Sequence, residues 1–222
     1  MSFRYELFES SPLKRVDTEE GRRYVTEDGN IYTSVTTALS YLTRKHIQRW
    51  RNAVGAEKAN SISLQAARAG TKMHAIAEKY CLDEDWKKDA NPVALNNFLN
   101  IKPYLDDNVE TIYGVELQMY SNELKCAGTS DLLCDYQGIN TILDFKTSRN
   151  FKSKEKITNY FLQAAAYGIM AEELYDWRPE QIVILMAVNN SEAVVYVEEM
   201  EHYRKLARNY FDLLHQGKIQ EL

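Results

Sequence analysis

The segment Lys125–Arg149 constrains the fold most, because it places charged residues inside two apolar runs. The first run, Gly128–Tyr136, and the second, Thr141–Thr147, are separated by the turn-forming pair Gln137-Gly138. Apolar and β-branched runs bounded by such a turn predict two short strands joined as a hairpin. We therefore expect this hairpin to lie in a largely buried sheet.

Three charged side chains interrupt the hairpin: Asp131 on the first strand, then Asp144 and Lys146 on either side of Phe145. Side chains alternate along a strand, so Asp144 and Lys146 share one face, and antiparallel pairing brings Asp131 beside them. Buried carboxylates are costly unless they hold a cation or are paired. The hairpin is either a surface element with a cross-strand salt bridge, or a site for one or two Mg²⁺ or Mn²⁺ ions.

Several motifs around these charges resemble a known group of enzymes. The sequence GTSD followed by DFK resembles the signature of the PD-(D/E)XK nuclease superfamily, with Ser130 at the position of the usual Pro. GTKMHAIAE upstream and FLQAAAYG downstream resemble the GxxxHxxxE and QxxxY elements of its RecB-like exonuclease branch. SVTT, from Ser34 to Thr37, resembles the entry of a phage and mitochondrial exonuclease group within that branch. The resemblance covers residues 34–197, and its motifs occur in the family order.

The resemblance implies an α/β fold: a PD-(D/E)XK restriction-endonuclease-like core with a central mixed β-sheet flanked by helices, preceded by a helical N-terminal part. Hydrophobic patterns agree with this, because strands are expected at 112–120, 128–136 and 141–147, a helix at 157–175, and strands at 181–188 and 193–197. We expect a single nuclease domain over 1–222. Its parts are an irregular segment and hairpin (1–35), a helical part (36–110), a βββαβ core (111–200) and a C-terminal helix (201–222).

The N-terminal half carries its own local signals. Glu27–Asn30 is strong turn chemistry between β-prone flanks, and predicts a hairpin over Tyr24–Val35. Ser34 or Thr36 is a typical helix cap. Helices are expected over 44–62, over 63–80 with an interruption at Gly70, and over 92–109, where Pro103 should kink or end the helix.

The resemblance also implies roles for individual residues. Lys146 would contact or deprotonate the attacking water, and Gln163 and Tyr167 would orient that water or the strand. The implied metal ligands are His74, Asp131, Asp144 and the backbone carbonyl of Phe145, with Glu116 as a further candidate. Glu78 is implied as a residue that orients a metal ligand without binding the metal itself. Without the resemblance, other interpretations stay open: His74 as a satisfied core or surface residue, Glu116 as an outward-facing strand residue, and Gln163 and Tyr167 as ordinary helix surface.

Basic residues near the expected site are candidates for substrate binding. A cluster on the expected 44–62 helix could grip a strand through phosphate contacts and stacking, and a Lys/Arg-rich segment follows Lys146. The alternatives are a solvated helix face with its Trp in the core, and a polar linker. The candidate substrate-binding residues are Arg44, Lys45, Arg49, Trp50, Arg149 and Lys152.

Composition limits the class of protein. The chain has 222 residues, a net charge of −5 and three widely spaced cysteines. A negative chain does not coat nucleic acid with its whole surface, so a nucleic-acid site must be local and metal-assisted. Three cysteines suit reduced thiols and cannot supply the four-cysteine iron–sulfur cluster of some RecB-like relatives. With no bilayer-spanning apolar run or signal-peptide pattern, we expect a cytoplasmic protein, in the host cytoplasm if the source is a phage, with no membrane partner.

The function implied by the resemblance is that of a Mg²⁺- or Mn²⁺-dependent exonuclease acting at ends of single-stranded or partly single-stranded DNA. Three alternatives remain: an endonuclease of the same superfamily, a catalytically silent DNA-binding or scaffold protein, and a structural metal protein. The phage-like entry motif favours a role in phage recombination, repair or DNA degradation. Replication or recombination proteins are then candidate partners, while the oligomeric state is open.

Overall fold

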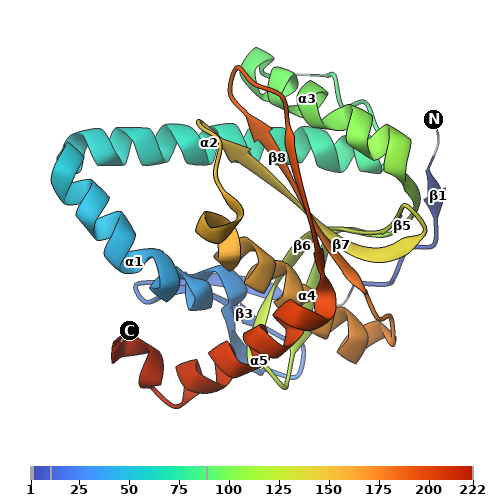
Figure 1. Cartoon of the computed structure of the whole chain (residues 1–222). Helices are drawn as coiled ribbons and strands as arrows, with labels where there is room; N and C mark the ends of the chain where they lie inside the picture. The colour runs from blue at the N-terminus through green and yellow to red at the C-terminus, as the bar shows by residue number, and fades with distance from the viewer. Residues whose placement is uncertain (1–2, 11, 89, 222) are drawn as a thin grey trace.

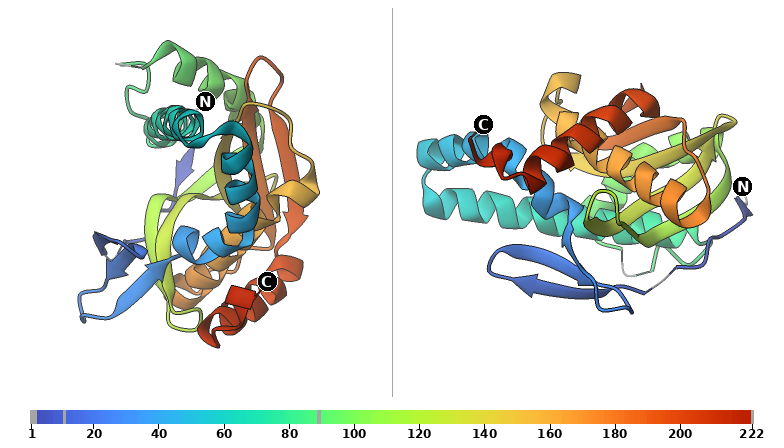
Figure 2. Two further views of the ribbon diagram at one scale, coloured as in Figure 1. Left: turned by 90° about the vertical axis from the view of Figure 1, so that its left-hand side faces the viewer. Right: turned by 90° about the horizontal axis from the view of Figure 1, so that it is seen from below.

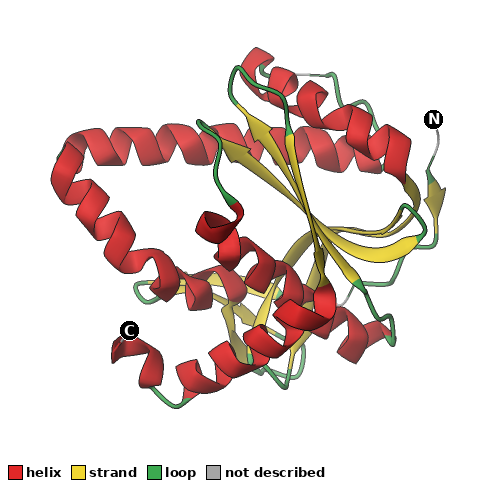
Figure 3. Ribbon diagram, in the orientation of Figure 1, coloured by secondary structure: helices red, strands yellow, loops and turns green. Residues whose placement is uncertain are grey.

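A mixed β-sheet organises the molecule, with helices on both of its faces (Figures 1 and 3). The computed structural model describes residues 3–10, 12–88 and 90–221. The strands are β1 (Arg4–Tyr5), β2 (Lys14–Thr18), β3 (Gly21–Val25), β4 (Ile31–Ser34), β5 (Val109–Ser121), β6 (Cys126–Tyr136), β7 (Ile139–Ser148), β8 (Gln181–Val188) and β9 (Val194–Glu199). The helices are α1 (Val35–Val54), α2 (Ala56–Cys81), α3 (Pro92–Asn108), α4 (Thr158–Tyr175) and α5 (Met200–His215), with short 3₁₀ turns η1 (Lys154–Ile157) and η2 (Lys218–Glu221).

The β5–β6–β7 meander forms the centre of the sheet and is followed by α4 and β8. Strand β6 pairs antiparallel with β5 and β7, whereas β8 runs parallel to β7 because α4 crosses between them. The path through the sheet is β2-β3-β4-β6-β7-β8-β9, with β5 pairing to both β6 and β1. The expected α/β class with a mixed sheet flanked by helices is confirmed, and the expected βββαβ order is observed.

Alternating side chains separate two hydrophobic cores. On β7 and β8, Ile142 and Ile184 pack with α1, α4 and α5, whereas Leu143 and Leu185 pack with α2 and α3. All four of these side chains are fully buried. Strands covered on both faces need continuous apolar sequence, and β8 meets this with Gln181 as its one polar residue. In β7 the apolar run Ile142–Leu143 is followed by the charged residues Asp144 and Lys146 on either side of Phe145.

The boundary between the first two helices differs from the prediction. Both helices were expected to meet near residue 62, with an interruption at Gly70, but α1 ends at Val54 and α2 runs unbroken from Ala56 to Cys81. Gly55 separates them with φ of 87°, a left-handed conformation that favours glycine, and its N–H closes α1 by donating to the Arg51 carbonyl. Gly70 lies inside α2 beside the end of β7, where a Cβ would make only an ordinary contact of 3.6 Å with Thr147 Oγ1.

Helices α1 and α2 form a V that projects from the sheet, with its apex at the α1–α2 junction (Figures 1 and 2). Ser34 caps α1 by accepting from Thr37 N, as its sequence predicts. Pro103 lies inside α3. The prediction that it could end the helix was therefore wrong. Among the described residues, no helix is both long and apolar enough to cross a membrane.

The N-terminal segment was expected to be irregular before a hairpin, and this was wrong. Strand β2 pairs with β3 along its whole length, and β3 pairs with β4 across the expected Glu27–Asn30 turn. Strand β4 then joins the central sheet in parallel beside β6, with Thr33 opposite Cys126 and Ser34 opposite Ala127. The polar sequence of β2 concealed a strand because all five of its residues are exposed.

Candidate active site

The β6–β7 hairpin brings its three charged residues together. The register places Leu132 opposite Leu143, so Asp131 and Asp144 are cross-strand neighbours on one face. Asp131 accepts a hydrogen bond from Phe145 N at 2.7 Å, and Lys146 Nζ forms an ion pair with Asp144. Asp144 is 1 % exposed and neither of its oxygens accepts a well-formed hydrogen bond. The hairpin is therefore not the surface element of the alternative interpretation.

Two residues from distant segments complete the charged cluster. His74 of α2 lies with Nδ1 3.4 Å from Asp131 Oδ1. Within the described part of the chain, ligand atoms of His74, Glu116 and Asp131 all lie within 4.8 Å of one another. We call Glu116, Asp131 and Asp144 the carboxylate cluster. Glu78 lies one turn along α2 from His74, and its charge raises the pKa of Glu116.

Glu116 occupies an unusual backbone conformation. Its φ is +45°, a left-handed value that is uncommon for a non-glycine residue in a strand. Val115 packs against the α2–α3 core, yet Leu117 belongs to the α4–α5 core, although strict alternation would place both on one face. The strand therefore reverses its faces at Glu116, and the reversal leaves this carboxylate beside Asp131. Strained conformations of this kind concentrate at functional sites.

Burial and mutual repulsion alter the pKa of these carboxyl groups. Burial raises the pKa of Glu116 to about 7, and the charge of Asp131 adds to the effect. Burial raises the pKa of Asp144 to about 6, against the opposing pull of Lys146. Burial also acts to raise the pKa of Asp131, but His74, Lys146 and the Phe145 N–H outweigh it and hold that pKa below its ordinary value. Asp131 is thus the most strongly anionic of the three.

The two cationic partners respond in the opposite sense. Burial lowers the pKa of His74, but the charge and hydrogen bond of Asp131 act in the opposite direction, and the net shift of this pKa is upward. Burial likewise lowers the pKa of Lys146, and the charges of Asp144 and Asp131 reverse that effect. Both pKa values rise because the carboxylates of Asp131 and Asp144 lie close to these groups. The cluster therefore attracts positive charge.

The donor set fits a divalent cation. Three carboxylates and one imidazole supply mainly oxygen ligands, which Mg²⁺ and Mn²⁺ prefer, and the carboxylates outnumber the protein's own cations in the cluster. Oδ1 of buried Asp144 is a second indication, because it has no partner while Oδ2 pairs with Lys146, and a buried atom of this kind is costly without a partner.

Helix α4 lines the other side of the hairpin. Gln163 Nε2 and Tyr167 Oη lie 3.4 Å apart, and Tyr167 is 2 % exposed. A Cβ at Gly128 would lie 2.8 Å from the Tyr167 ring, so only glycine on β6 leaves space for this tyrosine. At the start of α4, Tyr160 contacts both Lys146 and Lys152, and the sequence motifs did not single it out.

A cleft of about 300 Å³ opens beside these residues. His74, Glu116, Asp131, Gln163 and Tyr167 line it. The rest of its lining includes residues that sequence reasoning missed. They lie on the N-terminal strands and on the core strands: Arg15, Arg22, Tyr24, Gln118 and Thr129.

No local signal could have identified Arg15 and Arg22. They reach the cleft because β4 pairs with β6, whose sequence lies about a hundred residues downstream. Asp17 bridges them, with Oδ2 2.9 Å from Arg15 Nη2 and Oδ1 3.6 Å from Arg22 Nε.

The candidate substrate-binding residues of α1 lie apart from this cleft. Arg44, Lys45 and Arg49 are exposed and Trp50 is half-buried, outside both hydrophobic cores, and none of them lines the cleft. The core interpretation of Trp50 is therefore wrong. Arg149 is exposed just beyond β7, whereas Lys152 is half-buried and bonded to Tyr160.

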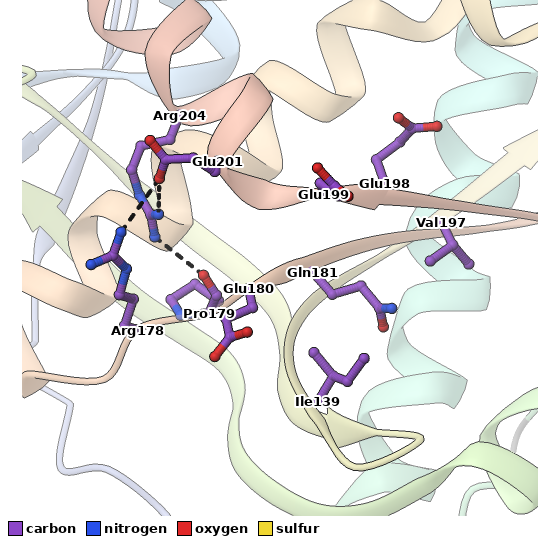
Figure 4. A pocket seen from close by; sticks show the side chains of 10 residues that line it. All are labelled: Ile139, Arg178, Pro179, Glu180, Gln181, Val197, Glu198, Glu199, Glu201 and Arg204. Carbon is purple, nitrogen blue, oxygen red and sulfur yellow. Dashed lines mark hydrogen bonds and ion pairs between the residues drawn. The ribbon is translucent and has the colours of Figure 1, made fainter.

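A larger pocket of about 740 Å³ lies elsewhere, at the start of β8 and the end of β9 (Figure 4). We call it the arginine pocket. Arg204 is 3 % exposed and donates to Glu201 Oε2 at 2.9 Å and to the Pro179 carbonyl at 3.2 Å. Arg178 also pairs with Glu201, at 3.4 Å. These contacts join α5 to the segment before β8, so their role is structural.

Comparisons with known proteins give few matches. No protein-family model matches the sequence, and no curated protein matches it. A crystal structure from Eubacterium rectale, described as a "Putative exonuclease", is similar over 68 % of this chain and 66 % of its own, with 13 % identity and a TM-score of 0.46. The chain thus spans slightly under two thirds of that protein's length. The crystal structure of SSO0001 is similar over 64 % of this chain and 74 % of its own, with 16 % identity and a TM-score of 0.29. Scores this low support no functional argument.

Proposed function

We propose that this protein is a divalent-metal-dependent nuclease that hydrolyses phosphodiester bonds in DNA, acting as an exonuclease on single-stranded or partly single-stranded ends. One observation supports the chemistry most directly: His74, Glu116 and Asp131 converge from three elements, within 4.8 Å, beside the buried Asp144–Lys146 ion pair. The choice of DNA, and of ends, rests on the motif resemblance alone.

A bound Mg²⁺ or Mn²⁺ would supply Lewis-acid stabilisation of the phosphate and a lowered pKa of bound water. Asp131, Glu116 and His74 would hold it, with Asp144 and the Phe145 carbonyl at the adjoining position. The upward shift of the His74 pKa reflects the anionic carboxylates, and a bound cation would favour the neutral imidazole that ligates metals. Metal binding would therefore release protons and weaken at low pH.

Lys146 would orient the attacking water with its ammonium, because its ion pair with Asp144 holds Nζ beside a candidate metal ligand. In the metal-free protein its pKa lies above the ordinary value, so it holds its proton at neutral pH. A role as hydrogen-bond donor to water or phosphate is therefore better supported than a role as general base. Gln163 and Tyr167 would donate to the phosphate from the facing helix.

Arg15 and Arg22 are the cations best placed to contact a neighbouring phosphate, because both line the cleft. Guanidinium groups bind phosphate with two parallel hydrogen bonds, and Asp17 already orients both side chains. The basic residues of α1 would contact the strand farther from the chemistry. A charge-removing change at Arg22 should reduce the salt dependence of single-strand binding by about 0.7 in the log–log slope.

The test is a time course on end-labelled linear single-stranded and duplex DNA and on a circular single strand, in Mg²⁺, Mn²⁺ or EDTA. We expect metal-dependent loss of linear strands only, with the first label released showing the polarity. Lys146→Met should remove the activity, and Lys156→Met, an exposed lysine at η1, is the matched control.

The other outcomes discriminate between the alternatives. Cleavage of the circle would identify an endonuclease of the same chemistry. Binding of DNA without cleavage of any substrate would indicate the silent scaffold and overturn the proposed reaction. Metal binding with neither DNA binding nor cleavage would leave a structural metal protein.

A further inference from the structure

Tyr160 is the third residue of α4 and shares a helix face with Gln163 and Tyr167, three and seven residues later. It is half-buried and packs against the α4–α5 core at its inner side. Two lysines also lie against its ring. A phenol in this position can act through both its ring and its hydroxyl.

The two lysines approach the ring from different segments. Lys146 Nζ of β7 lies 5.0 Å from the ring centroid, and Lys152 Nζ, from the loop after β7, lies 5.3 Å from it. Both distances are within the range of cation–π attraction. Lys152 Nζ also donates to Tyr160 Oη at 3.0 Å. One tyrosine therefore contacts the candidate catalytic lysine and a candidate substrate-binding lysine.

Each lysine has one further anchor. Lys146 forms its ion pair with Asp144, and its side chain is 17 % exposed. The backbone carbonyl of Lys152 accepts from Tyr196 Oη of β9, so the loop is tied to the sheet edge. A lysine stem has four rotatable carbons, and one carboxylate partner leaves Nζ free to swing about it. Contact with the Tyr160 ring restricts this motion of the Lys146 Nζ.

We propose that Tyr160 is a positioning residue that holds the Lys146 ammonium by its ring face and the Lys152 ammonium by its hydroxyl. This inference rests on the proposed nuclease function. Catalytic groups must be held within a fraction of an ångström of their working geometry, and a displacement of 1 Å costs up to about 100-fold in rate. Tyr160 links the placement of the catalytic lysine to the loop that contacts the substrate.

The two contacts can be separated by substitution. Tyr160→Phe keeps the ring and removes the hydroxyl, whereas Tyr160→Leu removes both. We expect Tyr160→Leu to lower kcat by about 10- to 100-fold. Tyr160→Phe should restore most of kcat but keep a raised KM, matching the KM of Lys152→Met. Tyr175→Leu is the matched control, because Tyr175 is half-buried on the same helix, stacked on Phe8 at 4.6 Å and away from the cleft.

A second readout does not depend on cleavage. Lysine acylation followed by mass spectrometry measures the reactivity of each ammonium in the folded protein. We expect Lys146 to become more reactive in Tyr160→Leu but not in Tyr160→Phe, and Lys152 to become more reactive in both. Thermal melting of each variant shows that it is folded.

The outcomes separate this inference from the proposed function. Wild-type cleavage with an unchanged kcat in folded Tyr160→Leu would overturn the positioning role and leave the nuclease intact. Equal losses of kcat in Tyr160→Phe and Tyr160→Leu would overturn the role of the ring. Unchanged Lys146 reactivity in Tyr160→Leu would overturn it independently. Absence of cleavage by wild type would overturn the nuclease function, and the catalytic use of Tyr160 with it.

Discussion

The carboxylate cluster and the ion pairs around Arg204 at the arginine pocket both contain buried charge, but only the ion pairs around Arg204 balance it. Around Arg204, two arginines, Arg178 and Arg204, form ion pairs with two glutamates, Glu172 and Glu201. In the carboxylate cluster, three acids share one lysine and one histidine, and Oδ1 of Asp144 has no partner. The larger cavity thus belongs to a self-sufficient structural network, and the smaller cleft to a network that needs another cation.

The largest expected effect is on catalysis by the carboxylate cluster. Asp131→Asn keeps an acceptor for the Phe145 N–H but removes the charge, and should lower cleavage by at least about 10³-fold, the scale of lost electrostatic stabilisation. The assay is single-turnover cleavage of labelled DNA. Asp135→Asn is the control on the same strand, because Asp135 accepts from Gly138 N at 2.6 Å outside the cleft. Equal activity in both variants would mean that the site is misplaced.

Metal addition should distinguish the two networks next. A ligand that binds only the folded state at 100 times its Kd stabilises the protein by about 2.7 kcal/mol. We expect Mg²⁺ or Mn²⁺ to raise the melting temperature of wild type and of Glu201→Gln, a variant of the arginine pocket. Asp131→Asn should not respond. A response that persists in Asp131→Asn would place the metal elsewhere.

Loss of a cation should harm the balanced network. Arg204→Met keeps the buried stem but removes the buried partner of Glu172 and Glu201, which keep only the exposed Arg178 and, for Glu201, Lys205. We expect the free energy of unfolding to fall by about 2 kcal/mol, less than for a fully buried pair because both glutamates are partly exposed. Urea denaturation measures this change. Cleavage by the folded variant at low temperature should match wild type, and a neutral effect on stability would show that the pocket is not structural.

Loss of an anion should have the opposite sign in the carboxylate cluster. The folded state raises the pKa of Glu116 from 4.5 to about 7, so the metal-free protein loses stability as pH rises through that interval. Glu116→Gln removes this cost and should stabilise the metal-free protein by about 1 kcal/mol at pH 8, after allowance for partial exposure. Urea denaturation in EDTA at pH 5 and pH 8 measures it.

Glu110→Gln is the control for that measurement, because Glu110 is exposed on the same strand. A wild-type stability that stays constant between pH 5 and pH 8, or that rises, would contradict the proposed repulsion. The same result would weaken the case for a cation site, since the excess of negative charge is its basis.

Local pattern predicted much of the fold. The strands β6, β7 and β8 and the helices α4 and α5 were expected near their observed positions. Each of them has a clear repeat of apolar residues and is bounded by residues that favour turns or end helices. Errors occurred where the pattern was weak. The exposed strand β2 has no buried face, and the α1–α2 junction is set by Gly55, whereas Gly70 is tolerated inside a long helix.

The candidate site divides in the same way. The relation of Asp131, Asp144 and Lys146 followed from the sequence, because a tight turn fixes the register of its hairpin and the register fixes which side chains face one another. His74 and Glu116 were named from motif resemblance, and the structure brings both beside Asp131. Nothing local predicted that β5 would reverse its faces at Glu116, since the reversal depends on two cores that form on opposite sides of the sheet.

By itself, the sequence determined the hairpin, its three charges and the order of the core elements, because these depend on interactions between near neighbours. Only the tertiary structure decided that Arg15 and Arg22 line the cleft and that the Tyr160 ring lies against Lys146. These positions result from the β4–β6 pairing and from the packing of α4 on the sheet. Both join segments far apart in the chain, and the burial that holds them together leaves no periodic trace in the residues concerned.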